Sequence, residues 1–109
     1  MSTSKPIDAE ASPIAGIDRL IHEPARLLIM SYLYVVESAD FTFLMRQTGL
    51  TWGNLSSHMT KLEEAGYIEV EKEFVGKKPN TMLKLTPAGR GAFQEYRQHM
   101  RLLFEDLPE

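Results

Sequence analysis

The apolar residues of this chain recur at helical spacing in three long stretches. The first covers residues 24–36, where the apolar face is wide enough for a buried helix and Pro24 suits the first helical position. The second covers residues 52–65, and the following Gly66 can take the left-handed conformation that ends a helix. The third covers residues 87–107 with steps of three and four residues and also opens with a proline. The pattern predicts three helices.

Two shorter patterns lie on either side of the first predicted helix. Four aliphatic residues at spacings of three or four predict a short N-terminal helix that ends before Pro24; they are Ile14, Ile17, Leu20 and Ile21. Residues 38–40 interrupt the helical pattern. After them, residues 41–43 can pair briefly as a strand, and residues 42–47 can form a short helix that Gly49 ends.

Side chains alternate with a period of two over residues 68–74, which is typical of a half-buried strand. One face of this strand is apolar and the other is acidic. Residues 76–80 contain the glycine, proline and asparagine of a turn together with two lysines. Residues 81–85 return as a second strand, so the segment predicts a β-hairpin with a basic tip.

The order of these elements predicts a winged helix-turn-helix of the α+β class. A tight turn over residues 48–51 joins two helices, and the hairpin that follows would be the wing. We expect a three-helix core, a two-stranded wing and a long C-terminal helix in one domain over residues 14–109, preceded by a flexible segment over residues 1–13.

In this fold the second helix of the pair enters the major groove of duplex DNA. Its apolar residues Leu55, Met59 and Leu62 would face inward. The outward candidates for contact with bases and phosphates are then Trp52, Asn54, Ser57, His58 and Lys61, and the wing candidates are Lys77, Lys78 and Asn80. Two of them have alternatives: His58 can equally pack between helices, and Trp52 can pack on the DNA backbone or on the neighbouring helix.

The net charge of −3 would oppose DNA binding if the charge were spread evenly over the surface. Acidic residues, however, crowd the beginning and the end of the chain, whereas four lysines fall in one segment; they are Lys72, Lys77, Lys78 and Lys84. The chain has no cysteine, its three histidines lack metal-ligand spacing, and glycine-rich phosphate loops are absent. We therefore expect no enzyme activity, no cofactor and no metal site.

The final predicted helix carries an aromatic and methionine stripe that can serve the core or a second copy of the chain. The preceding elements already supply a core, so a dimer interface is the preferred interpretation. Its candidates are Phe93, Tyr96, Met100, Leu103 and Phe104, together with Ile17, Leu20 and Ile21. Such a dimer can place two recognition helices about 34 Å apart, in successive major grooves.

Three runs of sequence resemble the core of small winged-helix transcriptional regulators of the MarR-like and ArsR-like groups. They are GNLSSH at residues 53–58, LEEAGYI at 62–68 and LTPAGR at 85–90, and PARL at 24–27 is similar to the opening of the ArsR-like first core helix. The resemblance covers residues 24–103. It implies a homodimeric regulator, by default a repressor, that binds a partly palindromic duplex with residues 52–65 in the major groove and the wing, residues 76–80, on the backbone. Related wings often end in arginines, and this one departs from them with Lys77 and Lys78.

The sequence leaves two further interpretations open. A winged-helix module that binds protein and not DNA would fit the net negative charge and the acidic row of Glu69, Glu71 and Glu73. An unknown small-molecule effector is also open, and since there is no cysteine pair it would not be a thiolate-bound metal. The chain has no pattern of a signal peptide or a membrane span, so we expect a cytoplasmic location without a membrane partner.

Overall fold

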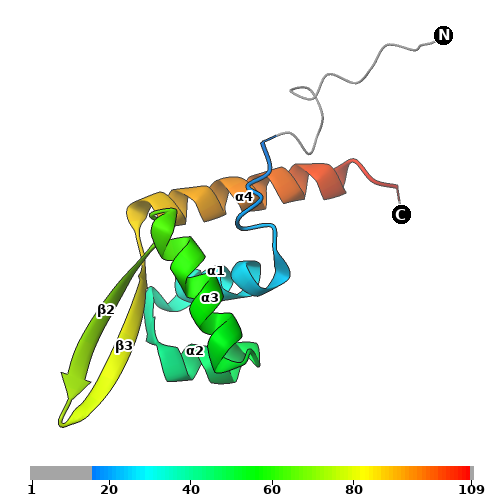
Figure 1. Ribbon diagram of the computed structural model, residues 1–109. Coiled ribbons are helices and arrows are strands. Elements are labelled where there is room, and N and C mark those ends of the chain that lie inside the picture. Colours follow the sequence, from blue (N-terminus) through cyan, green and yellow to red (C-terminus); the bar gives the residue numbers. More distant parts are fainter. Residues whose placement is uncertain (1–15, 109) are drawn as a thin grey trace.

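The structure, a computed structural model, describes residues 16–108. Its elements are α1 (Pro24–Val36), β1 (Ser38–Asp40), α2 (Phe41–Thr48), α3 (Trp52–Glu64), β2 (Ile68–Val75), β3 (Lys78–Leu85) and α4 (Pro87–Glu105). In Figure 1, α1, α2 and α3 form a compact body, β2 and β3 extend away from it as a long hairpin, and α4 lies across the top. This is the α+β winged helix-turn-helix that the pattern predicts, and the three long helices are confirmed.

Each of the four described helices begins at a side-chain cap that satisfies backbone N–H groups of the first turn. The caps are Glu23 for α1, Asp40 for α2, Thr51 for α3 and Thr86 for α4. Pro24 and Pro87 follow two of these caps, at a position where the missing N–H costs nothing. The chain leaves α2 through Gly49, which has a left-handed φ of 71°. Local sequence therefore sets these boundaries.

The strand before α2 lies earlier than the sequence pattern suggests. The pattern places it at residues 41–43, but the structure has β1 at Ser38–Asp40, where it pairs with β3 and opposes Ala39 to Leu83. The Asp40 carboxylate accepts the N–H of Phe43 at 2.7 Å, so the helix begins directly after it. The described sheet has three antiparallel strands in the order β1-β3-β2, one more than the two-stranded wing of the prediction.

Turns, and not the predicted short helix, occupy the described part of the segment before α1. The Asp18 carboxylate accepts the N–H groups of Leu20 and Ile21 at 2.9 and 3.1 Å, and a single helical-type bond joins His22 N–H to the Asp18 carbonyl at 2.8 Å. Pro24 has no N–H and cannot donate the next helical hydrogen bonds, so the turn at residues 18–22 does not extend into a helix. Ile14 and the predicted flexible segment over residues 1–13 lie outside the described residues.

The hairpin turn is shorter than the predicted tip over residues 76–80. Val75 pairs with Lys78, so only Gly76 and Lys77 form the turn, and Asn80 belongs to β3. Gly76 has a φ of 65°, the left-handed value that the first central residue of a type II′ turn requires. A proline at position 79 is compatible with a strand at the hairpin end, whereas its turn propensity had suggested a longer loop.

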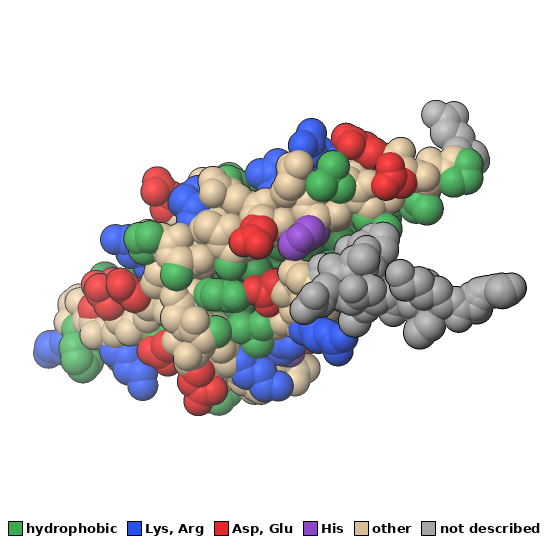
Figure 2. Space-filling model, turned by 90° about the horizontal axis from the view of Figure 1, so that it is seen from above, with side chains coloured by type: hydrophobic (Ala, Val, Ile, Leu, Met, Phe, Trp, Pro, Cys, Tyr) green, Lys and Arg blue, Asp and Glu red, His purple; other side chains and the backbone are tan. Residues whose placement is uncertain are grey.

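Figure 2 looks down on α4 and shows basic and acidic side chains interspersed over this face, with no continuous basic area. Large apolar side chains also surface at the end of this region; they are Leu102, Phe104 and Leu107. No helix within residues 16–108 is long and apolar enough to cross a membrane.

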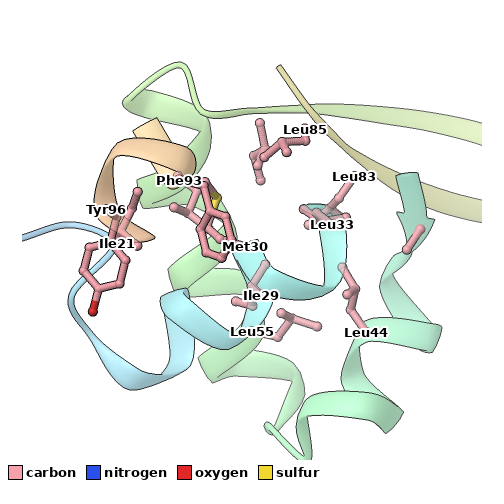
Figure 3. Packing of buried hydrophobic residues seen from close by; sticks show 13 residues of the cluster. Ile21, Ile29, Met30, Leu33, Leu44, Leu55, Leu83, Leu85, Phe93 and Tyr96 are labelled. Atoms are coloured by element: carbon pink, nitrogen blue, oxygen red, sulfur yellow. The ribbon is translucent and has the colours of Figure 1, made fainter. Parts of the chain in front are cut away.

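The hydrophobic core lies where α1, α2 and α3 meet the sheet and the first half of α4 (Figure 3). Its fully buried side chains are Ile21, Ile29, Met30, Leu33, Leu44, Leu55, Leu62, Ile68 and Leu83. Phe93 and Tyr96 are also buried and attach α4 to this core. Ile21, Phe93 and Tyr96 therefore fill the interior of a single chain, which corrects their predicted place at a dimer interface. Helical periodicity marked them as apolar but could not say which apolar surface would cover them.

Candidate nucleic-acid interface

The outer face of α3 is polar and consists of small or charged side chains. Leu55 and Leu62 are fully buried and fix which side of the helix faces the core. The exposed residues on the other side are Gly53, Asn54, Ser57, Thr60, Lys61 and Glu64. Asn54, Ser57 and Lys61 thus lie on the surface as the sequence predicts.

Three residues of this face were not among the residues predicted from the sequence; they are Gly53, Thr60 and Glu64. Gly53 and Thr60 are exposed, and each lies about one turn from Ser57 along the same side of the helix. A Cβ on Gly53 would meet no atom within 4 Å, so the fold does not require glycine there. The absent side chain lets another molecule approach the backbone closely. The i, i+4 and i+7 spacing of Gly53, Ser57 and Thr60 was the signal that could have identified Gly53 and Thr60.

Trp52 is 67% exposed at the start of α3 and packs one side of its ring against Phe41 of α2. The two ring centroids are 6.0 Å apart and the planes are tilted by 53°, a normal aromatic pair. The indole borders a groove of about 340 Å³ between the helices and the wing. Its walls are Phe41, Thr42, Trp52, Ser56 and Met59 on the helical side and Lys72, Pro79, Asn80 and Thr81 on the wing.

The wing has two chemically different faces because alternate residues of a strand point to opposite sides. One face carries Lys72 opposite Thr81 and Phe74 opposite Pro79. Lys72, Thr81 and Pro79 line the groove beside α3, so this face of the wing is turned toward α3. The other face carries the acidic row; its members are Glu69, Glu71 and Glu73. The three glutamates therefore lie on the opposite face of the hairpin from Lys72.

The three predicted wing residues differ in their surroundings. Lys77 and Lys78 are exposed at the hairpin end, as expected. Asn80 instead lies opposite Glu73, and its Nδ2 donates to the Glu73 Oε1 at 3.2 Å. Its amide is occupied by an acidic side chain, so Asn80 is a poor candidate for a phosphate contact. Lys72, which no individual site prediction included, is better placed.

His58 does not lie on the outer face of α3. Its ring is half-buried against the beginning of α1, with Nδ1 3.0 Å from Nη1 of Arg26 and Nε2 3.5 Å from Oε2 of Glu23. Helical geometry explains this, because His58 follows the buried Leu55 by three residues and lies on the same side. His58 therefore packs between helices, which was one of its two predicted alternatives, and its predicted outward position was wrong.

Glu23 has a double role at this junction. Its carboxylate accepts the N–H groups of Ala25 and Arg26 as the cap of α1 and also faces the ring of His58. Burial by itself raises the pKa of Glu23, but the two N–H groups together with the His58 and Arg26 side chains outweigh it, so the pKa lies below its ordinary value. The carboxylate is consequently ionised at neutral pH.

Comparison with known proteins agrees with this geometry. A family model described as a winged helix DNA-binding domain matches residues 25–104. The uncharacterized protein MJ0432 of Methanocaldococcus jannaschii is 36% identical over 78 residues, which are 72% of this chain and 85% of that protein.

Solved structures share the fold. A transcriptional regulator homologue from Pyrococcus horikoshii OT3 superposes with a TM-score of 0.77 at 27% identity, over 83% of this chain and 91% of that one. A MarR family transcriptional regulator from Silicibacter pomeroyi gives a TM-score of 0.65 at 20% identity, over 92% and 69% of the two chains. With its recognition helix, wing and matched residues 25–104, the chain belongs to the winged helix DNA-binding domain family and is MarR-like in fold.

Proposed function

We propose that the protein is a dimeric transcriptional regulator that binds specific sequences of double-stranded DNA. One observation carries the proposal: α3 and the wing face that carries Lys72 line one groove, the polar outer face of α3 is exposed, and the acidic row lies on the other face of the wing. A duplex is attracted to such a surface even when the whole chain is negative, because screening confines electrostatic contacts to about 10 Å.

The proposed contacts follow from the chemistry of each side chain. In the proposed complex the exposed Asn54 and Ser57 hydrogen-bond base edges in the major groove, and Gly53 allows the backbone of α3 to lie close to the DNA. The cationic side chains neutralise phosphates; they are Lys61 at the end of α3 and Lys72, Lys77 and Lys78 on the wing. Trp52 packs against the sugar-phosphate backbone from its position on Phe41.

We further propose that the second half of α4 forms the dimer interface. Figure 1 shows this half extending past the helical body. Phe104 is 59% exposed, and a monomer would leave it in water together with Leu102 and Leu107. Ile17, Leu20, Met100 and Leu103 are only partly buried and remain candidates for the same interface. The symmetry of such a dimer would present two α3 helices to two half-sites.

Repression by occupying the promoter is the proposed mode of action, since bound protein blocks access of polymerase. Control by a small-molecule effector is a further part of the proposal. A groove of about 540 Å³ between α1 and α4 has the size of a ligand site. Its lining is partly apolar and partly cationic, and includes Leu27, Phe93, Tyr96, Met100, Arg97 and Arg101.

The rival function is a module that binds protein through the acidic wing face. Fluorescence anisotropy separates the two functions, with purified protein, a pool of genomic duplexes, a single-stranded control and a salt series. We expect duplex binding that weakens steeply with salt, since released counterions supply much of the affinity. If no duplex is bound even at low salt, the proposed function is wrong and the protein-binding module takes its place.

A further inference from the structure

Three elements hold the turn segment Asp18–Glu23, here called the strap. The hydroxyl of Tyr67, at the start of β2, donates to the Asp18 carboxylate. On α4, the Tyr96 hydroxyl and Nδ1 of His22 are joined by a hydrogen bond of 2.8 Å. From α1, Nε of Arg26 donates to the carbonyl of Leu20 at 2.6 Å. The strap is therefore fixed to the body of the protein and to α4.

Arg26 is only 9% exposed, and it is the buried charged residue of the described chain. A guanidinium stays protonated in proteins and has donors only, so its burial requires acceptors. Its acceptors are the Leu20 carbonyl in the strap and Nδ1 of His58 in α3. One buried cation thus joins the strap to the recognition helix.

Both nitrogens of the His58 ring face charged residues. Nδ1 lies 3.0 Å from the donor Nη1 of Arg26. Nε2 faces the Glu23 carboxylate at the end of the strap, 3.5 Å away. Both ring nitrogens are therefore engaged by the protein, and neither is left to contact DNA.

We propose that His58 is a positioning residue, which holds α3 against Arg26 and the strap so that its outer face meets base edges at the correct angle. The inference rests on the proposed DNA-binding function and adds a specificity residue to it. His58 lies between Asn54 and Lys61 along α3, at the middle of the helix. A shift of α3 at this point would move all of its proposed base-contacting side chains together.

Positioning affects specific and non-specific binding differently. Base recognition depends on directional hydrogen bonds, whereas phosphate contacts from flexible lysines tolerate small displacements. Loss of the His58 contacts should therefore reduce affinity for the selected operator and leave affinity for random duplex nearly unchanged. A direct phosphate contact would reduce both.

The test compares matched variants in the full-length chain. His58→Asn can offer an oxygen to Arg26 in the place of Nδ1, whereas His58→Leu has similar size and offers nothing. Glu23→Gln removes the charge that faces the ring but keeps an oxygen for the cap of α1. Each variant is measured for melting temperature, for affinity to an operator selected from genomic duplexes, and for affinity to random duplex across salt concentrations.

We expect His58→Leu to lose about tenfold in operator affinity, as removal of one buried hydrogen-bond partner implies, with its random-duplex affinity and salt dependence unchanged. His58→Asn should recover most of that loss. Glu23→Gln should weaken operator binding, and the double variant with His58→Leu should lose less than the sum, since the two side chains act on one contact.

Equal operator affinity of His58→Leu and the parent would overturn the inference while duplex binding itself stands. An equal loss of affinity for operator and for random duplex in His58→Leu would also overturn the inference, because it would make His58 a direct DNA contact. Fully additive losses in the double variant with Glu23→Gln would overturn it as well. If His58→Leu does not fold, His58→Asn and Glu23→Gln decide by the same comparison. Failure of the parent to bind any duplex would instead refute the proposed function.

Discussion

The backbone of Gly89 packs directly on the carbonyl group of Tyr67. A Cβ at position 89 would overlap the carbonyl oxygen and lie 2.8 Å from the carbonyl carbon. The same oxygen accepts the N–H of Thr86 at 3.0 Å, and the N–H of Gly89 donates to Thr86 Oγ1 at 2.9 Å. The first turn of α4 is therefore locked onto the junction between α3 and β2, and glycine is required there by contact and not by backbone conformation.

Gly89→Ala should destabilise the protein by about 1–3 kcal/mol, the usual cost of overpacking, because the backbone on both sides must move apart. Gly91→Ala is the matched control in the same helix, since a Cβ there would meet nothing within 4 Å. It should stabilise by about 0.5–1 kcal/mol through helix propensity. Urea denaturation measures both variants, and equal stability of the two would contradict the close packing.

Exposed lysines of α3 and of the hairpin end should contribute to DNA binding by neutralising phosphates. Lys61→Ala and the double change Lys77→Ala with Lys78→Ala should weaken duplex binding and reduce the slope of log K against log salt by about 0.9 for each phosphate that is no longer neutralised. Lys84→Ala is the control, because Lys84 lies opposite Glu69 near the base of the hairpin, whereas Lys77 and Lys78 lie at its exposed end. If Lys84→Ala reduces the slope as much as Lys61→Ala, the proposed contact surface is wrong.

Trp52 is the single tryptophan of the chain and reports on the proposed interface without a label. It is largely exposed beside the groove, so bound duplex should change the intensity or wavelength of its emission. The change should saturate at the same DNA concentration as anisotropy. Trp52→Phe should keep the contact with Phe41 and most of the affinity, whereas Trp52→Ala should lose both. Emission that is insensitive to saturating duplex would place Trp52 outside the interface.

Phe104→Asp should convert the proposed dimer to a monomer, since it places a charge where two apolar surfaces meet. Phe74→Asp is the control, because Phe74 is also exposed, at 75%, but belongs to β2 of the wing and not to α4. Size-exclusion chromatography with light scattering gives the mass of each. A dimeric Phe104→Asp variant would mean that the interface lies elsewhere. Phe93 does not serve for this test, because it is buried in the single chain.

Alkaline stability should depend on Tyr67. Burial, followed by the hydrogen bond to Asp18 and the charges of Asp18 and Glu95, raises the pKa of Tyr67 from 10.0 to about 12. Between these values the unfolded chain releases a proton that the folded protein keeps. The stability from this group is therefore complete below pH 10 and is lost as the pH rises toward 12.

Tyr67→Phe should accordingly be less stable at neutral pH but lose less of its stability over the alkaline range. Denaturation at about pH 8 to 12 measures this difference, with the partly exposed Tyr32 of α1 changed to Phe as a control. Burial also raises the pKa of Tyr96, so part of the alkaline loss should persist in Tyr67→Phe. Parallel pH curves of the parent and Tyr67→Phe would refute the assignment.

The sequence by itself determined the fold, because the signals that set it are local. Proline at the first position of α1 and α4, threonine caps and apolar periodicity act within a few residues, and the long helices and the hairpin were predicted from them. The acidic face of the wing was also implicit in strand alternation. Small errors arose where two local signals competed: Asp40 caps a helix and also ends a strand, and Pro79 is both a turn former and tolerated at a strand end.

Only the tertiary structure decided which partner covers each apolar or polar surface, because such partners lie far apart along the chain. Periodicity marked Phe93, Tyr96 and Ile21 as apolar, yet it could not distinguish the chain's own core from a second copy. His58 carried the chemistry of a DNA contact, and it became a structural residue because the chain brings Arg26, which is 32 residues away, next to its ring. Sequence patterns set the direction of a side chain relative to its own helix, whereas long-range packing sets what that side chain meets.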